Sequence, residues 1–428
     1  MKKNRGIIMY KNLDNTRLST ILAKEQARYE EYKAMNLKLD MSRGKPCKEQ
    51  LDLSMDMLDC INSKSNLVRK IDYRNYGIAD GIPELKELFG ALLGGISKDE
   101  IIVAYNASLN LMYDTIQRAM QFGILGNTPW NKEEKLKWLC PVPGYDRHFA
   151  ITELFGFDMI NVPCDDNGPD MDMIEELVKD PTVKGMWCVP KYSNPMGIIY
   201  SDEVVKRLAA LKPAAKDFRI MWDNAYMVHS LYGQDQLLDI YAEAKKNGNE
   251  DIVYIFGSTS RVTFSGAGVA FMAGSKANMD DARKYMGKQT IGPDKLSQLM
   301  HATYFNSVES IYAHMEKHAA ILRPKFEAVL EILEEEFWNT GIATWNKPRG
   351  GYFISCFLAE GTAKRTVALA KEAGVVFTGA GATYPYKNDP ADSNVRIAPT
   401  LPPMDELITA MRIFCCCAKV AYLEKLTK

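Results

Sequence analysis

The fold is decided by the stretch Phe218-Arg-Ile-Met-Trp-Asp-Asn-Ala-Tyr226. Its first half has the length and apolar character of a buried strand, which ends in the carboxylate of Asp223, and the phenol of Tyr226 follows one helical turn later. In an open parallel α/β sheet, ligands bind beyond the carboxyl ends of the strands, so we expect Asp223 to face a cleft. There it needs a cationic or proton-donating partner, unless it only caps a helix that follows.

Further segments on both sides of this stretch have the character of strands. In chain order they are residues 101–104, 137–140, 159–162, 185–189, 251–256 and 269–273. From about residue 310 the pattern changes to a long charged helix, followed by strands at 350–355, 375–378 and 394–398 and a closing helix. We therefore expect a large α/β domain over residues 55–315 and a smaller α+β domain over 316–428, to which the N-terminal segment 1–54 contributes.

Length and composition agree with two globular domains. A chain of 428 residues is longer than the roughly 250 to 300 residues that one hydrophobic core supports. Hydrophobic residues make up 46% and charged residues 25%, as in an ordinary globular protein. The formal net charge is −1 and the basic residues are scattered, so we expect no nucleic-acid or anionic-membrane partner. Small molecules and other proteins are the expected partners.

The N-terminus and the cysteines predict a cytoplasmic protein. The apolar run after Lys2, Lys3 and Arg5 covers only residues 7–9, too short for a signal peptide. No apolar stretch approaches the roughly 20 residues that span a bilayer. The nine cysteines lack the paired spacing of a disulfide framework and are expected as reduced thiols. Three of them are consecutive, at 415–417, and cannot all face one metal ion, so core packing is expected for them.

Several loops present polar groups near the ends of the predicted strands. Ser108 opens a helix directly after strand 101–104, where free N–H groups can bind a phosphate, although an ordinary helix cap looks the same. Tyr145 and Asn194 follow two other strands in turns rich in Pro and Gly. Tyr76 lies in a glycine-flanked loop, and Gly44 can let the backbone approach a ligand closely.

Together these residues have the order and spacing of class I aminotransferases: Tyr76, Ser108, Tyr145, Asn194-Pro195-x-Gly197, Asp223-x-x-Tyr226, Ser258-x-Ser260 and Arg396. The segments Ser42-Arg-Gly-Lys-Pro46, Tyr192-Ser-Asn-Pro195 and Arg396-Ile-Ala-Pro399 resemble most closely a bacterial aspartate-aminotransferase-like branch. The chain thus resembles a fold-type I pyridoxal-phosphate enzyme over nearly its whole length. The resemblance implies an α/β fold with a mostly parallel seven-stranded sheet, and a homodimer with active sites at the subunit interface.

The resemblance also implies a role for each residue. Asp223 would keep the ring nitrogen of pyridoxal 5′-phosphate protonated, Asn194 and Tyr226 would bind the ring 3′ oxygen, and Tyr145 would stack on the ring. The phosphate would be held by the following groups: Ser108, Ser258, Ser260, the backbone of Asn106 and Ala107, and Tyr76 from a neighbouring subunit. Arg396 would bind the substrate α-carboxylate as a bidentate fork, with Gly44 and Asn194 completing the substrate site.

Two positions depart from the family pattern. The family places an arginine on the phosphate where this chain has Gly268-Val269, so phosphate binding must use other donors, Arg261 itself or a neighbouring lysine. More seriously, Arg261 occupies the position of the catalytic Schiff-base lysine. A guanidinium is neither a nucleophile nor a proton shuttle at neutral pH, so we expect a nearly inactive chain. A substitution made to trap a bound intermediate and natural degeneration both account for Arg261.

Three functions are compatible with the resemblance. The first is an aminotransferase that moves an amino group between an amino acid and a 2-oxo acid, impaired by Arg261. The second is a β-lyase or decarboxylase on the same scaffold, which a survey of products formed by the lysine form would separate from the first. The third is a non-catalytic protein that binds the cofactor or its amino-acid aldimine, favoured if related natural chains also carry arginine at position 261.

Overall fold

The computed structural model describes residues 9–428, so Lys2, Lys3, Arg5 and most of the short apolar run after them lie outside the described residues. Its largest element is an eight-stranded sheet with the order β2-β9-β8-β7-β6-β3-β4-β5. The strands are β2 (Ile101–Val103), β3 (Lys137–Val142), β4 (Asp158–Asp165), β5 (Gly168–Pro169), β6 (Val183–Cys188), β7 (Arg219–Asp223), β8 (Val253–Ser258) and β9 (Ala270–Gly274). Strands β4, β3, β6, β7 and β8 pair in parallel, whereas β9 runs antiparallel to β8 and β2.

The mostly parallel α/β architecture expected from the sequence is confirmed, with one strand more than the seven predicted. The extra strand, β5, has two residues and pairs antiparallel with the end of β4. It exists because the chain turns back within a few residues of Asp165, with Gly168 in a left-handed conformation at φ +132°. The addition lies at the edge of the sheet and leaves the order of the central strands unchanged.

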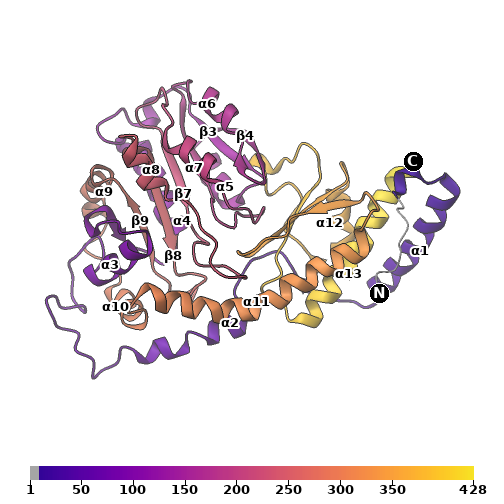
Figure 1. Cartoon of the computed structure of the whole chain (residues 1–428), viewed down its shortest axis with the longest axis horizontal. Helices are drawn as coiled ribbons and strands as arrows, with labels where there is room; N and C mark the ends of the chain where they lie inside the picture. The colour runs from indigo at the N-terminus through magenta and orange to yellow at the C-terminus, as the bar shows by residue number, and fades with distance from the viewer. Residues whose placement is uncertain (1–8) are drawn as a thin grey trace.

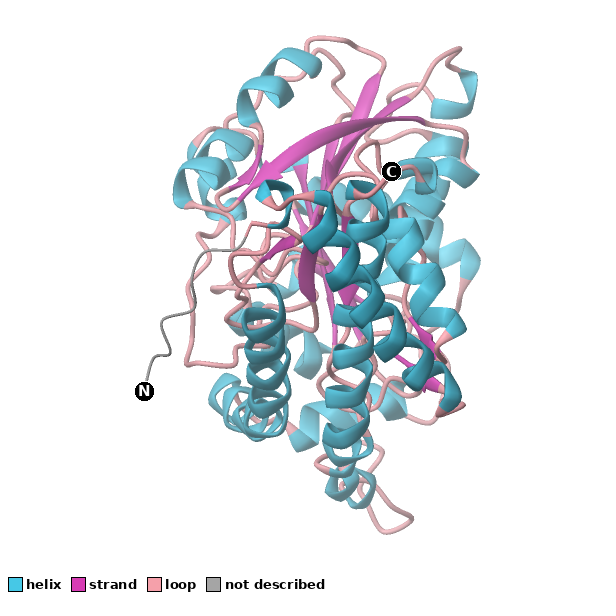
Figure 2. Ribbon diagram, turned by 90° about the vertical axis from the view of Figure 1, so that its right-hand side faces the viewer, coloured by secondary structure: helices cyan, strands magenta, loops and turns pink. Residues whose placement is uncertain are grey.

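Helices cover both faces of the large sheet (Figure 2). They are α3 (Pro83–Leu92), α4 (Ser108–Phe122), α5 (Asp146–Leu154), α6 (Met171–Leu177), α7 (Asp202–Ala209), α8 (Ile240–Lys246), α9 (Lys276–Gln289) and α10 (Lys295–Tyr304). Successive residues of β7 alternate between two apolar cores: Ile220 and Trp222 belong to one, and Met221 belongs to the other. This alternation fixes which side of the strand each functional group faces.

A second unit is built from both ends of the chain. Its antiparallel sheet contains β10 (Ala343–Trp345), β11 (Ile354–Leu358) and β13 (Asn394–Ile397), and β1 (Leu39–Asp40) pairs in parallel with β12 (Val375–Val376). Its helices are α1 (Asn15–Ala34), α2 (Lys48–Asp52), α11 (Val308–Phe337), α12 (Ala363–Glu372) and α13 (Met404–Leu426). Helix α11 runs along one side of the molecule from the large sheet to this unit (Figure 1). We propose the domain limits 1–54, 55–315 and 316–428. The limit at residue 315 falls inside α11, so this helix connects the two larger domains.

The predicted strand at 350–355 is displaced in the structure, where β11 begins at Ile354. Gly350 and Gly351 instead pass directly over Tyr192, and a Cβ at Gly350 would lie 2.5 Å from the Tyr192 ring. Gly351 is left-handed, with φ +80°, which a strand does not allow. Close backbone contact, which periodicity does not reveal, therefore delays the strand.

The remaining features of the fold are short 3-10 helices, the thiols and the apolar character of the helices. The 3-10 helices are Tyr10–Asn12, Met55–Asp59, Lys98–Glu100, Trp130–Lys132, Glu250–Ile252 and Pro385–Lys387. All nine cysteines are free thiols, and Cys415, Cys416 and Cys417 are fully buried in the core of the second unit, as predicted. Over residues 9–428, no helix combines the length and apolar character that crossing a bilayer requires.

Candidate active site

Asp223 is the last residue of β7 and is only 3% exposed. Its Oδ2 accepts a hydrogen bond of 3.0 Å from Nε2 of His148, whose ring stacks on Trp187 with centroids 4.4 Å apart. Its Oδ1 is buried and has no hydrogen-bond partner among the described residues. One carboxylate oxygen is therefore fixed, while the other is left for a donor that the chain itself does not supply.

Tyr226 lies in a turn directly after β7. No helix begins there, so the alternative that Asp223 only caps a following helix is wrong. The Tyr226 side chain is 2% exposed, and burial raises the pKa of its phenol to about 12. Tyr145, at the N-terminus of α5, meets the His148 ring edge-on at 4.9 Å between centroids, and burial raises its pKa as well. Both phenols remain protonated at neutral pH and can donate hydrogen bonds.

Helix α4 begins at Ser108, so the cap residue is Ala107, and the prediction that Ser108 caps the helix is wrong. Ala107 has an extended backbone and no side-chain oxygen to bond the N–H groups of the first turn. The N–H of Asn110 donates to the Ala107 carbonyl at 3.1 Å, whereas those of Ser108 and Leu109 are available to an anion at the positive end of the helix dipole. The Ser260 hydroxyl donates to the carbonyl of Asn106 at 2.9 Å and lies 3.0 Å from the Ser258 hydroxyl. The structure thus joins the loop after β8 to the start of α4.

Arg396 of β13 is 7% exposed and lies over the Phe353 ring, with Cζ 4.8 Å from its centroid. Its Nη1 donates to Asp146 at 2.8 Å and to the side-chain oxygen of Asn194 at 3.1 Å. Its Nη2 donates to the Thr378 hydroxyl at 3.2 Å. The buried Nε has no partner among the described residues. The guanidinium is thus positioned by groups from α5 and from the loops after β6 and β12, and two of its five N–H donors, on Nε and Nη2, have no hydrogen bond to a described residue.

Arg261 lies between two tyrosine rings, with its Cζ 5.4 Å from the centroid of Tyr226 and 5.3 Å from that of Tyr352. Its Nε donates to the carbonyl of Gly44 at 3.3 Å. Burial alone would lower the pKa of the guanidinium, but the neighbouring phenol oxygens and Asp223 outweigh burial and raise it. Arg261 is therefore a permanent cation that ties the loop after β8 to the N-terminal segment.

All five histidines of the chain are buried around these groups. His148 bonds Asp223, His301 bonds the hydroxyls of Thr259 and Thr263 at 3.0 and 2.8 Å, and His314 lies 2.9 Å from the carbonyl of Val262. His229 lies 3.4 Å from the carbonyl of Arg261, and burial lowers its pKa to about 3.

The fifth histidine, His318, lies between His314 and Gln50, and Gln50 donates to Tyr352 at 2.9 Å. The segment that carries Arg261 is thus held by neutral imidazoles.

Tyr76 is not brought to the site within this chain. Its side chain is 82% exposed, on the loop before α3. Gly268-Val269 is where the family pattern has its phosphate-binding arginine. Gly268 packs tightly against the segment before α4, and a Cβ there would be 3.0 Å from the carbonyl of Asn106. Close packing at this point accounts for the glycine. The contacts of the described residues do not identify a substitute for the arginine.

His148, Asp146 and Thr378 were missed by sequence reasoning, although each contacts a predicted residue. His148 follows Tyr145 by one helical turn, and this spacing is the signal that could have placed it beside the same ligand. Asp146 and Thr378 carried no comparable signal, since their contact with Arg396 depends on how the two sheets meet.

An acid at the end of a central parallel strand, a helix N-terminus after another strand of that sheet and a buried arginine from a second sheet are features expected of a fold-type I aminotransferase. The chain matches the aspartate amino-transferase family over residues 13–428. It belongs to this family.

Individual relatives support this assignment over almost the whole chain. An aspartate aminotransferase from Corynebacterium glutamicum is 45% identical over 421 residues, 97% of either chain. A putative aminotransferase from Mycolicibacterium smegmatis is 46% identical over 408 residues, 94% of this chain and 95% of the relative. The crystal structure of an aspartate transaminase from Corynebacterium glutamicum superposes with a TM-score of 0.96 at 44% identity, covering 98% of this chain and 100% of that chain. None of these three names favours a lyase or a decarboxylase.

Proposed function

We propose that this chain binds pyridoxal 5′-phosphate and carries the scaffold of an aminotransferase acting on an amino acid and a 2-oxo acid, with turnover strongly impaired by Arg261. The observation that supports it most directly is the unpartnered Oδ1 of Asp223. A buried carboxylate oxygen without a donor is costly, and a protonated pyridine nitrogen is a donor of the required kind. Family membership supplies the class of reaction.

The other groups also fit this cofactor. The free N–H groups at the start of α4, with Ser108, Ser258 and Ser260, suit a phosphate. Asn194 and Tyr226 would hydrogen-bond the ring oxygen, and both are almost fully buried. When bound, the protonated ring draws electrons from the substrate Cα. His148 assists by holding the second oxygen of Asp223, so the carboxylate keeps one orientation.

Arg396 is proposed to bind the substrate carboxylate. Its planar fork suits a bidentate contact, and the Nε–H and one Nη2–H remain as donors after Asp146, Asn194 and Thr378 are bonded. The carbonyl of Gly44 is already bonded to Arg261, so the Gly44 contribution to substrate binding falls to its backbone N–H. The names of the relatives make aspartate the first amino donor to test.

Arg261 accounts for the impaired turnover. The family uses a lysine at this position to attach the cofactor and to move a proton to and from Cα, a task typically worth about 10² to 10⁴ in rate. The guanidinium keeps the positive charge but cannot take up a proton at neutral pH. Its bond to Gly44 and its place between Tyr226 and Tyr352 support retention of the fold.

The test compares the Arg261 chain with Arg261→Lys, each supplied with the cofactor. We expect the Arg261 chain to bind the cofactor reversibly, with no adduct fixed by borohydride and almost no transamination of aspartate. Arg261→Lys should gain a borohydride-fixed adduct and turnover with at least one amino-acid and oxo-acid pair. Arg261→Met, which has neither the charge nor an amine, shows whether loss of the guanidinium alone restores turnover. Rapid transamination by the Arg261 chain, or a lysine form with neither adduct nor turnover, contradicts the proposal.

We further propose a homodimer in which Tyr76 reaches the phosphate of the neighbouring subunit. Tyr76 and Ile291 are 82% and 66% exposed, and they lie in the loop before α3 and the loop between α9 and α10, which match segments that cross between subunits in the family. An obligate interface buries on the order of 2,000 Å² or more. Sedimentation should give a dimer at micromolar concentration. Tyr76→Ala should weaken binding of the cofactor phosphate without dissociating the dimer. A stable monomer with bound cofactor contradicts the dimer. The nine free thiols favour a reducing compartment, and we propose the cytoplasm.

A further inference from the structure

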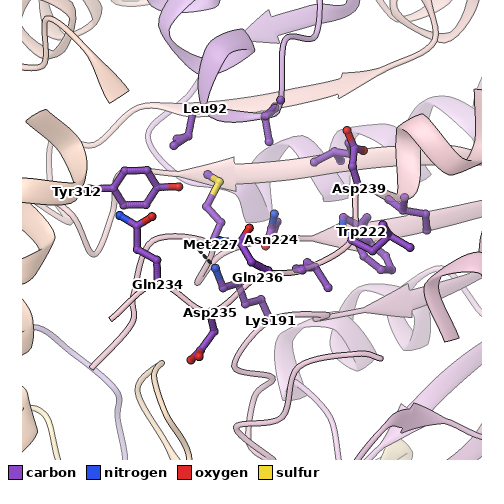
Figure 3. Close-up of a pocket in the computed structure, with 16 residues that line it drawn as sticks. Leu92, Lys191, Trp222, Asn224, Met227, Gln234, Asp235, Gln236, Asp239 and Tyr312 are labelled. Atoms are coloured by element: carbon purple, nitrogen blue, oxygen red, sulfur yellow. Dashed lines mark hydrogen bonds between the residues drawn. The ribbon is translucent and has the colours of Figure 1, made fainter. Parts of the chain in front are cut away.

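A cavity of about 240 Å³ lies beside β8 and the carboxyl ends of β6 and β7. Its lining residues are drawn in Figure 3. Trp222 and Asn224 line it, whereas Asp223 between them bonds His148. Because alternate residues of a strand point to opposite faces, the cavity and the candidate active site lie on opposite sides of the end of β7. The rest of the wall comes from the end of α3, the loop before α8 and Tyr312 of α11.

Lys191 is the unusual group of this cavity. Its side chain is only 9% exposed, and its Nζ donates to the carbonyl of Met227 at 2.9 Å. No carboxylate among the described residues lies within 4.0 Å of this amine. Burial lowers the pKa of Lys191 to about 8, although the more distant Asp235 acts against this shift. Besides the bond to Met227, the ammonium has a cation–π contact with Tyr192, whose ring centroid lies 5.4 Å from Nζ, and no anionic partner among the described residues.

The acidic groups of the cavity are already engaged elsewhere. Asp235 accepts from Arg349 at 3.0 Å and from the Tyr192 hydroxyl at 2.9 Å. Asp239 caps α8 by accepting from the backbone N–H of Tyr241 and Ala242, at 2.8 and 3.1 Å. Asp235 is thus paired with Arg349 and Asp239 is bonded at the N-terminus of α8, and neither carboxylate forms an ion pair with Lys191.

A second polar group lacks a partner at the same wall. The side-chain oxygen of Asn224 is buried without a hydrogen bond to any described residue. The two ends of an amide are interchangeable by rotation, so Asn224 can offer either a donor or an acceptor to a ligand. The side chains of Leu92, Met227 and Tyr312 border the same space and supply apolar surface (Figure 3).

We propose that this cavity binds a small organic carboxylate with an apolar tail, the carboxylate on Lys191 and Asn224 and the tail against Leu92, Met227 and Tyr312. An anion there neutralises a buried ammonium, and the cavity walls remove the tail from water. The proposal is independent of the aminotransferase assignment, because it uses none of the groups that face Asp223.

The test uses sodium isovalerate, titrated into the chain by calorimetry. We expect saturable binding that Lys191→Met weakens about tenfold or more, as for loss of a charged hydrogen bond. Lys206→Met, which changes an exposed lysine of α7, should leave binding unchanged. Isovaleramide, which has the same shape without the charge, should bind at least tenfold more weakly. Arg396→Leu should retain the site, because a carboxylate bound at Arg396 is a different event.

Two further variants keep the test decisive if Lys191→Met does not fold. Leu237→Trp fills the cavity from the loop before α8 without touching the amine and should abolish binding. Lys191→Arg preserves the cation and should retain part of the affinity. Absence of isovalerate binding, binding that is unchanged in Lys191→Met or Leu237→Trp, or binding that Arg396→Leu abolishes, each overturns the proposal.

Discussion

Asp223 and Glu336 are both largely buried carboxylates, and they are satisfied very differently. Glu336, on α11, accepts from Arg28 of α1 and from Arg412 and Lys419 of α13, and both of its oxygens are engaged. Burial opposes its ionisation, but the hydrogen bonds from Arg28 and Lys419 outweigh burial and lower its pKa to about 2. Asp223 has one bond, from His148, and one free oxygen.

The difference separates a carboxylate that holds the fold together from one that is reserved for a ligand. The Glu336 cluster joins three helices from opposite ends of the chain, so its partners are all internal. The carboxylate of Asp223 is incomplete without an external donor, which makes it expensive for folding and useful for binding. Substitution of Glu336 should therefore lower the unfolding free energy, and substitution of Asp223 should lower the affinity for the cofactor.

The largest effect is expected for Glu336→Ala. Removing it takes the shared anion from Arg28, Arg412 and Lys419, which then keep only their ion pairs with Glu25 and Glu335. Loss of one partner from a buried ion pair costs about 3 to 5 kcal/mol of unfolding free energy, and the remaining pairs favour the lower end of that range. Urea unfolding monitored by far-ultraviolet circular dichroism measures this loss. Glu331→Ala, an exposed glutamate of the same helix, is the matched control and should change stability by less than about 0.5 kcal/mol. Equal effects of the two variants would mean that the cluster is not a structural anchor.

A smaller effect, on binding and not on folding, is expected for Asp223→Ala. It removes one partner of a charge-assisted hydrogen bond worth about 1.5 to 3 kcal/mol, so affinity for pyridoxal 5′-phosphate should fall by on the order of ten- to a hundredfold. Fluorescence or absorbance titration with the cofactor measures the change. Without cofactor, the unfolding free energy should hardly fall. The lost carboxylate has only one of its two oxygens hydrogen-bonded, so its burial contributes little to stability. Unchanged cofactor affinity and spectrum would refute the assignment of the whole site.

The smallest effect is a change in the acid limb of the stability profile. The pKa of Glu336 is about 2 in the folded chain and about 4.3 in an unfolded one. Between these values the unfolded state binds more protons, so the Glu336 contribution is full above about pH 4.3 and is lost as the pH falls towards 2. Unfolding free energy measured across this window should show a slope that Glu336→Gln reduces by at most about 1.4 kcal/mol per pH unit. Parallel profiles for both chains would contradict the assignment.

Much of the candidate site could be predicted because it depends on topology. Parallel strands end at one edge of their sheet, so Asp223 and Asn194 had to lie near each other once their strands were recognised. His148 could not be placed in the same way, because its contact depends on the rotation of α5 about its axis. The cap of α4 moved by one residue to Ala107, a shift that local sequence does not resolve.

The parts of the fold that escaped prediction are short. Strands β1, β5 and β10 contain two, two and three residues, too few to show a period. Their existence depends on partners distant in the chain: Leu39 pairs with Val375, and Ala343 with Leu358. Burial of Gln50 and His318 within one hydrogen-bond network is likewise a product of long-range packing.

The pairing of β1 with β12 also sets an order of events during synthesis. Leu39 leaves the ribosome long before Val375, and domains generally fold from the N-terminal end as the chain emerges. The strands β2 to β9 are complete by Gly274, so the large sheet can close while α1 and β1 still lack their partners. Helix α1, whose Arg28 bonds Glu336 of α11, therefore stays exposed until the last third of the chain has been synthesised. Nascent chains stopped before residue 375 should present it to chaperones.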